Sequence, residues 1–111
     1  MKLDFFRDET GEPRARGRGR YARLAAFLQS DVQGSRTLLR RIARAVDGVE
    51  SGEEERWEST GNAYTLVLTS EGAAFESNQE EEEQEPGIVS LADLRAALGE
   101  WAEFLSSDPH G

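Results

Sequence analysis

The sequence predicts an α+β fold with an N-terminal β-hairpin, two central helices, a three-stranded antiparallel meander and a C-terminal helix. Two observations carry this prediction. Apolar side chains recur at every second residue near the N-terminus and in the middle of the chain, and at intervals of three and four residues elsewhere. Turn-forming residues separate these stretches. With 111 residues, 37% of them hydrophobic, we expect residues 1–111 to form a single domain.

The N-terminal hairpin is predicted from two stretches around a turn. Residues 2–7 alternate, with Leu3 and Phe5 on one face, which is typical of a half-buried strand. Residues 8–13 are dense in turn formers. Residues 14–20 carry an arginine at every second position, so we expect a charged edge strand over them.

Two amphipathic helices are predicted next. From Tyr21 to Val32 apolar residues recur at intervals of three and four, which favours a helix. Ser35 is a suitable N-cap for a second helix, and Gly48 is expected to end it as the C′ residue. The apolar face of this second helix comprises Leu38, Leu39, Ile42, Ala45 and Val46.

The meander is predicted from three stretches that alternate apolar and polar residues. Candidate strands cover residues 55–60, 63–69 and 73–77, and the middle one has the clearest alternation. Residues 79–87 are acidic and contain almost no apolar side chain, so we expect a flexible, solvated loop there.

A C-terminal helix is predicted because Ser90 can cap it and Asp93, three residues on, can complete a capping box. Its apolar stripe must be buried, either on the sheet or across a dimer interface. We therefore leave the oligomeric state open between monomer and homodimer. The stripe comprises Leu91, Leu94, Leu98, Trp101 and Leu105.

Charge is distributed unevenly along the chain, whose formal net charge is -9. Residues 1–44 carry 11 basic and 5 acidic side chains, whereas residues 45–111 carry 2 basic and 17 acidic ones. This asymmetry predicts either two surfaces for different partners or neutralisation between the two halves.

The composition excludes most catalytic and metal chemistry. The chain has no cysteine and one histidine, His110, and it contains no glycine-rich phosphate loop or nucleophile elbow. We therefore expect no enzymatic activity, no cofactor and no metal. The apolar runs are far shorter than the roughly 20 residues of a membrane span, and the N-terminus does not have the apolar stretch of a signal peptide. We expect a cytoplasmic protein that does not bind membranes.

The surplus of carboxylates leads to our first functional hypothesis. An acidic surface attracts basic protein surfaces at long range, including those that normally bind nucleic acid in the transcription and translation machineries. We expect a small interaction protein that docks on such a surface. The predicted partner-binding residues are Glu53, Glu54, Glu55, Glu58, Glu80, Glu81, Glu82 and Glu83.

The alternative hypothesis is an RNA- or DNA-binding protein. Arginines interspersed with glycines contact phosphates and stack on bases in some RNA-binding segments. The net charge of -9 disfavours this hypothesis, because it repels polyanions. A charged edge strand and a solvated helix face explain the same residues more simply. The candidate nucleic-acid-binding residues are Arg14, Arg16, Arg18, Arg20, Arg36, Arg40 and Arg44.

Three short clusters carry a family resemblance. They are Phe5-Phe6-Arg7-Asp8-Glu9-Thr10-Gly11 at the start, Trp57, Gly61, Tyr64, Thr65 and Leu66 in the middle, and Asn78-Gln79 before the glutamates. In order and spacing they resemble the YacL family of small uncharacterised bacterial proteins. The resemblance implies a compact domain and no established activity. For Arg7, Asp8 and Thr10 we expect a network that stabilises a turn rather than a ligand site.

Overall fold

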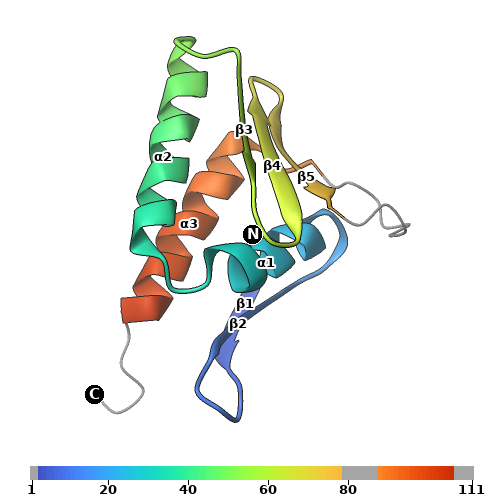
Figure 1. The fold of residues 1–111 in the computed structure, drawn as a ribbon, viewed down its shortest axis with the longest axis vertical. Coiled ribbons are helices and arrows are strands. Elements are labelled where there is room, and N and C mark those ends of the chain that lie inside the picture. Colours follow the sequence, from blue (N-terminus) through green and yellow to red (C-terminus); the bar gives the residue numbers. More distant parts are fainter. Residues whose placement is uncertain (1–2, 79–87, 107–111) are drawn as a thin grey trace.

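The computed structural model of the chain describes residues 3–78 and 88–106, which have the predicted α+β architecture (Figure 1). A two-stranded sheet has the order β1-β2, and a three-stranded antiparallel sheet has the order β3-β4-β5. In chain order the elements are β1 (Leu3–Arg7), β2 (Pro13–Gly17), a 3-10 helix (Gly19–Tyr21), α1 (Ala22–Phe27), a π-helix (Leu28–Val32), α2 (Arg36–Ser51), β3 (Arg56–Thr60), β4 (Tyr64–Thr69), β5 (Gly72–Ser77) and α3 (Leu91–Ser106).

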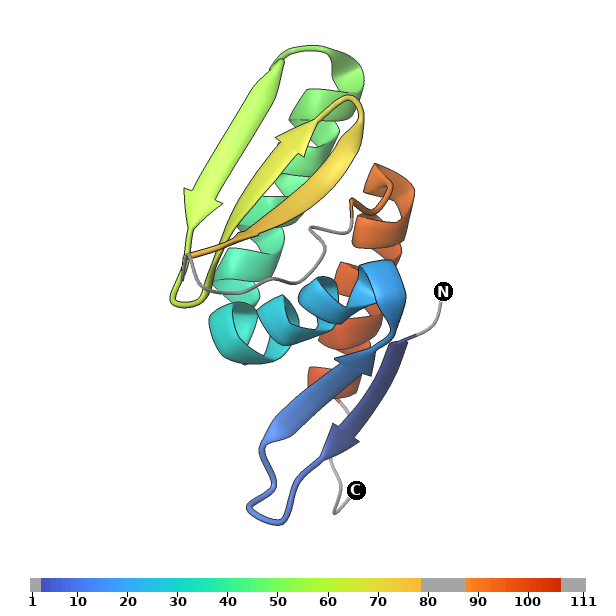
Figure 2. The same cartoon turned by 90° about the vertical axis from the view of Figure 1, so that its right-hand side faces the viewer.

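The two sheets lie towards opposite ends of the longest axis, with the helices between and behind them (Figures 1 and 2). Leu66, Leu68 and Phe75 are fully buried on the inner face of the larger sheet. The hairpin packs against α1 and α3, and Phe5 meets the ring of Trp101 edge-on with the centroids 5.3 Å apart. The apolar stripe of α3 is buried within this single chain from Leu91 to Trp101, which is 0% exposed, and Leu105 at its end is half-buried.

The second strand is shorter than the period-two pattern predicts. The strand β2 ends at Gly17, where a Cβ atom would lie 2.6 Å from the backbone oxygen of Tyr21. Gly19 then takes a positive φ of 58°, and the chain enters the 3-10 helix. The strand predicted over residues 14–20 is therefore wrong beyond Gly17, because these two glycines let the chain turn back on itself.

The helix α2 begins as predicted and ends later than predicted. The Ser35 hydroxyl accepts a hydrogen bond from the Leu38 N–H at 3.2 Å, which confirms the N-cap. Gly48 lies inside the helix, and Gly52 ends it with a φ of 84°. The predicted end at Gly48 is wrong because Val49, only 4% exposed, extends the buried stripe by a further turn.

The predicted first helix covers α1 and the π-helix that follows it. Gln33 N–H donates to Leu28 O at 2.8 Å, and Gln33 itself has a φ of 51°, which is rare for a residue other than glycine. Its carbonyl accepts the indole N–H of Trp101 at 2.8 Å. This hydrogen bond to a buried side chain helps to offset the backbone strain and fixes α3 against the turn.

Within residues 3–78 and 88–106, no helix combines the length and the apolar content that crossing a bilayer requires.

Candidate functional site

The acidic residues of the α2–β3 connector are the first candidate site. Glu53, Glu54 and Glu55 are all exposed. The connector is held close to the helix end, because Glu54 N–H donates to Gly48 O at 3.1 Å and Glu53 N–H donates to the Ser51 hydroxyl at 3.4 Å. In Figure 1 this connector lies at one end of the longest axis. We call Glu53, Glu54, Glu55 and Glu58 the acidic patch; the predicted Glu80–Glu83 lie outside the described residues.

Glu58 differs from the other members of the acidic patch in having a cation beside it. Its carboxylate accepts a hydrogen bond from Arg56 Nε at 3.1 Å, and the two side chains are 49% and 56% exposed. Glu58 thereby raises the pKa of the Arg56 guanidinium. Such an exposed pair contributes little to stability, because water screens it.

Ion pairs between described residues never link the basic first half of the chain to the acidic second half. Arg14 pairs with Asp8, Arg56 with Glu58, and Arg95 with Asp47 and Glu50. No ion pair between described residues therefore neutralises one half with the other, although Arg41, Arg44 and Glu54 line the same groove.

The arginines of the alternative hypothesis belong to two segments of the chain, residues 14–20 and the helix α2. Tyr21, next to Arg20, donates its hydroxyl to Asp93 in the first turn of α3, at 3.0 Å. Arg36 donates to the hydroxyl of Ser106 in the last turn of α3, at 2.7 Å. The two anchor points are about 20 Å apart along the helix. Arg20 and Arg36 thus lie beside opposite ends of α3.

Arg14 and Arg16 both lie on the exposed side of β2, where each has a neighbour in the hairpin. Arg14 pairs with Asp8 at 2.9 Å. The guanidinium of Arg16 lies over the ring of Phe6, 5.1 Å from its centroid.

The exposed arginine row on α2 matches the prediction of a solvated helix face, since Arg36, Arg40 and Arg44 are all exposed.

The family motif at the N-terminus forms the predicted turn-stabilising network. Asp8 Oδ1 accepts hydrogen bonds from the Thr10 N–H at 2.9 Å, from the Thr10 hydroxyl at 2.7 Å and from the Glu12 N–H at 3.0 Å. The Thr10 hydroxyl, followed by Arg14, holds the pKa of the Asp8 carboxyl well below its usual value of 3.8. Arg7 completes the turn by donating to Gly11 O at 3.1 Å.

The second family cluster surrounds the carboxylate of Asp31, which the sequence pattern does not mark as functional. Asp31, at the end of the π-helix, accepts the Ala63 N–H at 2.9 Å and the Tyr64 N–H at 3.0 Å. Gly61 packs against this carboxylate so closely that a Cβ would lie 2.6 Å from Asp31 Oδ2. Asp31 thus clamps the β3–β4 turn to the helical layer, and Gly61 is needed to make room for it.

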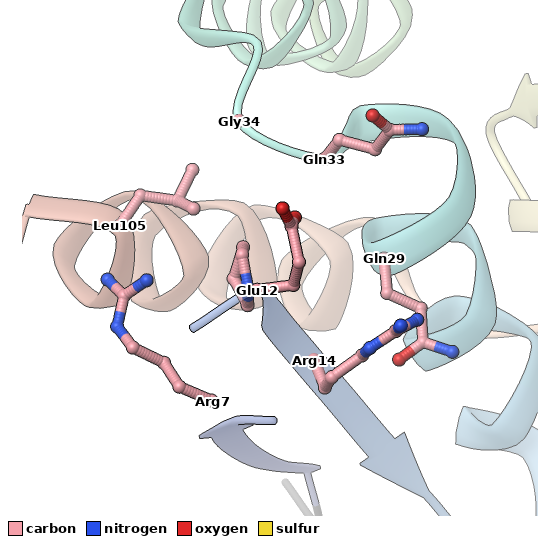
Figure 3. Close-up of a pocket in the computed structure, with 8 residues that line it drawn as sticks. Arg7, Glu12, Arg14, Gln29, Gln33, Gly34 and Leu105 are labelled. Atoms are coloured by element: carbon pink, nitrogen blue, oxygen red, sulfur yellow. The ribbon is translucent and has the colours of Figure 1, made fainter. Parts of the chain in front are cut away.

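A polar pocket of about 460 Å³ lies between the hairpin, the π-helix and the end of α3 (Figure 3). Arg7, Arg14, Gln29 and Gln33 line it, but all four already have partners in the fold. Gln29 accepts the Ala15 N–H at 3.1 Å, and Gln33 donates to Ser30 O at 2.8 Å. These four polar side chains thus hold the hairpin, the π-helix and α3 together around the pocket, which the Glu12 side chain also lines.

A model of a protein family described as "Uncharacterised protein family (UPF0231)" matches residues 1–105. The chain belongs to the UPF0231 family. This family contains YacL, so the match confirms the resemblance predicted from the sequence. No solved structure matches the chain.

Three UPF0231 proteins illustrate the similarity. The chain is 33% identical to one from Cronobacter sakazakii over 108 residues, which cover 95% of this chain and 88% of the relative. It is 29% identical to one from Erwinia tasmaniensis and 32% identical to one from Yersinia pestis, each over 79 residues. These two alignments cover 71% of this chain and 65% and 66% of the relatives.

Proposed function

We propose that this UPF0231 protein binds a basic protein surface through its acidic patch, in the cytoplasm and without enzymatic activity. The observation that carries the proposal is the segregation of charge. Glu53, Glu54 and Glu55 are exposed, and no described cation forms an ion pair with them. Surfaces that bind nucleic acid in the transcription and translation machineries have the complementary charge.

The charge layout of α2 supports the same proposal. Its four arginines lie in the first nine residues of the helix, and Asp47 and Glu50 lie near its end. This order opposes the helix macrodipole, whose negative end is at the C-terminus. The layout therefore lowers the stability of the helix itself, while Asp47 and Glu50 pair with Arg95 and tie this end of α2 to α3. It also places two carboxylates near the acidic patch.

The test compares two variants that remove the same amount of charge. One replaces Glu53, Glu54 and Glu55 by Gln, and the other replaces the exposed Glu9, Glu100 and Glu103 by Gln. Tagged proteins are used in pull-downs from a bacterial lysate at low and at moderate salt. We expect the wild type and the second variant to retain the same basic proteins at low salt, and the first variant to lose them.

Two outcomes contradict the proposal. One is an equally empty pull-down at both salt concentrations, and the other is equal retention by the two variants. A mobility-shift titration with RNA and DNA tests the alternative directly. Binding there that is lost when Arg36, Arg40 and Arg44 become Ser would favour nucleic-acid binding instead.

A further inference from the structure

Two of the sheet edges in this protein are covered by specific contacts. On β5, Ala73 donates to Val89 O at 2.8 Å and accepts from Val89 N–H at 3.0 Å. The next outward carbonyl, that of Phe75, accepts from the buried guanidinium of Arg23 at 2.7 Å. On β2, the outward N–H of Ala15 donates to the side chain of Gln29. These contacts satisfy backbone groups that would otherwise pair with another chain.

The outer edge of β3 has no such cover. Gly61 N–H donates to Tyr64 O at 2.8 Å, and hydrogen-bonded and non-bonded pairs alternate along an antiparallel ladder. The backbone groups of Arg56, Glu58 and Thr60 therefore point away from β4. No described residue forms a hydrogen bond with them, and in Figure 2 the lime-green strand β3 is the outermost element of its sheet.

We propose that the β3 edge pairs with the β3 edge of a second copy of the chain, joining the two sheets into one of six strands. The strand is complementary to itself in one antiparallel register. When Trp57 lies opposite Trp57 of the second copy, Arg56 lies opposite Glu58 of that copy, and Glu58 lies opposite its Arg56. Such a contact has two-fold symmetry and is closed, so it yields a dimer.

Charge and shape both select this register. Arg56 and Glu58 already form an ion pair within one chain, and pairing two edges joins both ion pairs into a network of four alternating charges. A shift of the two-fold axis to Glu58 would place this carboxylate opposite itself, which is unfavourable. The half-buried Trp57 borders a groove of about 200 Å³ that Arg41, Ala45 and Glu54 also line. The facing tryptophans would fill part of this groove.

The first experiment is charge reversal, measured by sedimentation equilibrium of the purified protein over a wide concentration range. We expect the wild type to form a concentration-dependent dimer. Arg56→Glu and Glu58→Arg should each raise the dissociation constant of the dimer by about tenfold or more. Each substitution places like charges opposite each other at both of the 56–58 pairs in the interface. The double variant Arg56→Glu/Glu58→Arg should restore the dimer. A monomeric wild type at every concentration, or single variants that dimerise like the wild type, would overturn the proposal.

A second experiment tests the register, using a chain that contains no natural cysteine. The variants Arg56→Cys and Glu58→Cys are oxidised separately and as a mixture. The mixture should give a covalent heterodimer, whereas each variant alone should give little, since the two like positions are too far apart for a disulfide. Equal cross-linking in all three samples would contradict the register.

The dimer uses Glu58 of the acidic patch, but it does not depend on the proposed function, and the two can fail separately. Sedimentation uses the purified protein alone, and the Glu53, Glu54 and Glu55 to Gln variant keeps both Arg56 and Glu58. That variant should dimerise like the wild type even where it no longer retains basic proteins.

Discussion

Carboxylates have different uses at the two ends of the molecule. In the turn that follows β1, the Asp8 carboxylate accepts two backbone N–H groups and one hydroxyl, and it pairs with Arg14. In the connector before β3, Glu53, Glu54 and Glu55 are exposed and have no ion-pair partner among the described residues. The first carboxylate is bound into the fold by hydrogen bonds, whereas the second group faces solvent. The difference shows that the number of acidic residues in a segment does not locate a binding surface. The hydrogen-bond partners of each carboxylate distinguish a structural carboxylate from an exposed one.

The largest expected effect comes from the Asp31 carboxylate, which joins the β3–β4 turn to the helical layer. Asp31→Ala removes the acceptor of the Ala63 and Tyr64 N–H groups and detaches the β3–β4 turn from the helical layer. We expect a loss of about 3 kcal/mol in the free energy of unfolding, measured by urea denaturation. Asp47→Ala is the matched control, because it removes an exposed ion pair with Arg95 and should cost less than about 1 kcal/mol. Similar losses in both variants would show that Asp31 is not a clamp.

A smaller effect, with a characteristic pH dependence, is expected at Asp8. Its pKa is lowered in the folded protein, so its charged form stabilises the fold at pH values above the usual pKa of 3.8. This stabilisation should decrease as the pH falls below 3.8. Asp8→Asn should therefore have a lower thermal midpoint than the wild type at pH 7, and the difference should shrink towards pH 2. A difference that does not change with pH would contradict the assigned network.

The smallest expected effect on stability is at the acidic patch. Replacement of Glu53, Glu54 and Glu55 by Gln should change the free energy of unfolding by no more than about 0.5 kcal/mol. Chemical denaturation of this variant measures it alongside the Asp8 and Asp31 variants. A loss as large as that of Asp31→Ala would mean that these glutamates have a structural role, which would remove the contrast between the two ends.

The periodic spacing of apolar residues predicted most of the helices and strands, but it could not predict contacts between residues far apart in the sequence. The alternation in β4 and the three-and-four spacing in α3 depend on neighbouring residues, so they could be seen in the sequence. Asp31 and Arg23 could not be recognised, because their partners lie more than 30 residues away. Gly48 and Gly52 are equally good helix ends by composition, and only the burial of Val49 distinguishes them.

Only the local features of the candidate site could be predicted from the sequence. The exposure of Glu53, Glu54 and Glu55 follows from a charged connector between two elements, which can be recognised locally. The separation of Arg20 from Arg36 could not be predicted, because it depends on which end of α3 each one approaches. That β5 is covered and β3 is open likewise could not be predicted, because the cover of β5 comes from the distant residues Val89 and Arg23.

The two tryptophans provide built-in optical probes for these separate questions. Trp101 is fully buried where the hairpin, the turn at Gln33 and α3 meet, so its fluorescence should report on the integrity of the core. Trp57 is half-buried on the edge strand beside the acidic connector, so water and small quenchers can reach it. A variant that keeps only Trp101 would therefore report unfolding by its emission, and a variant that keeps only Trp57 would report association at the surface.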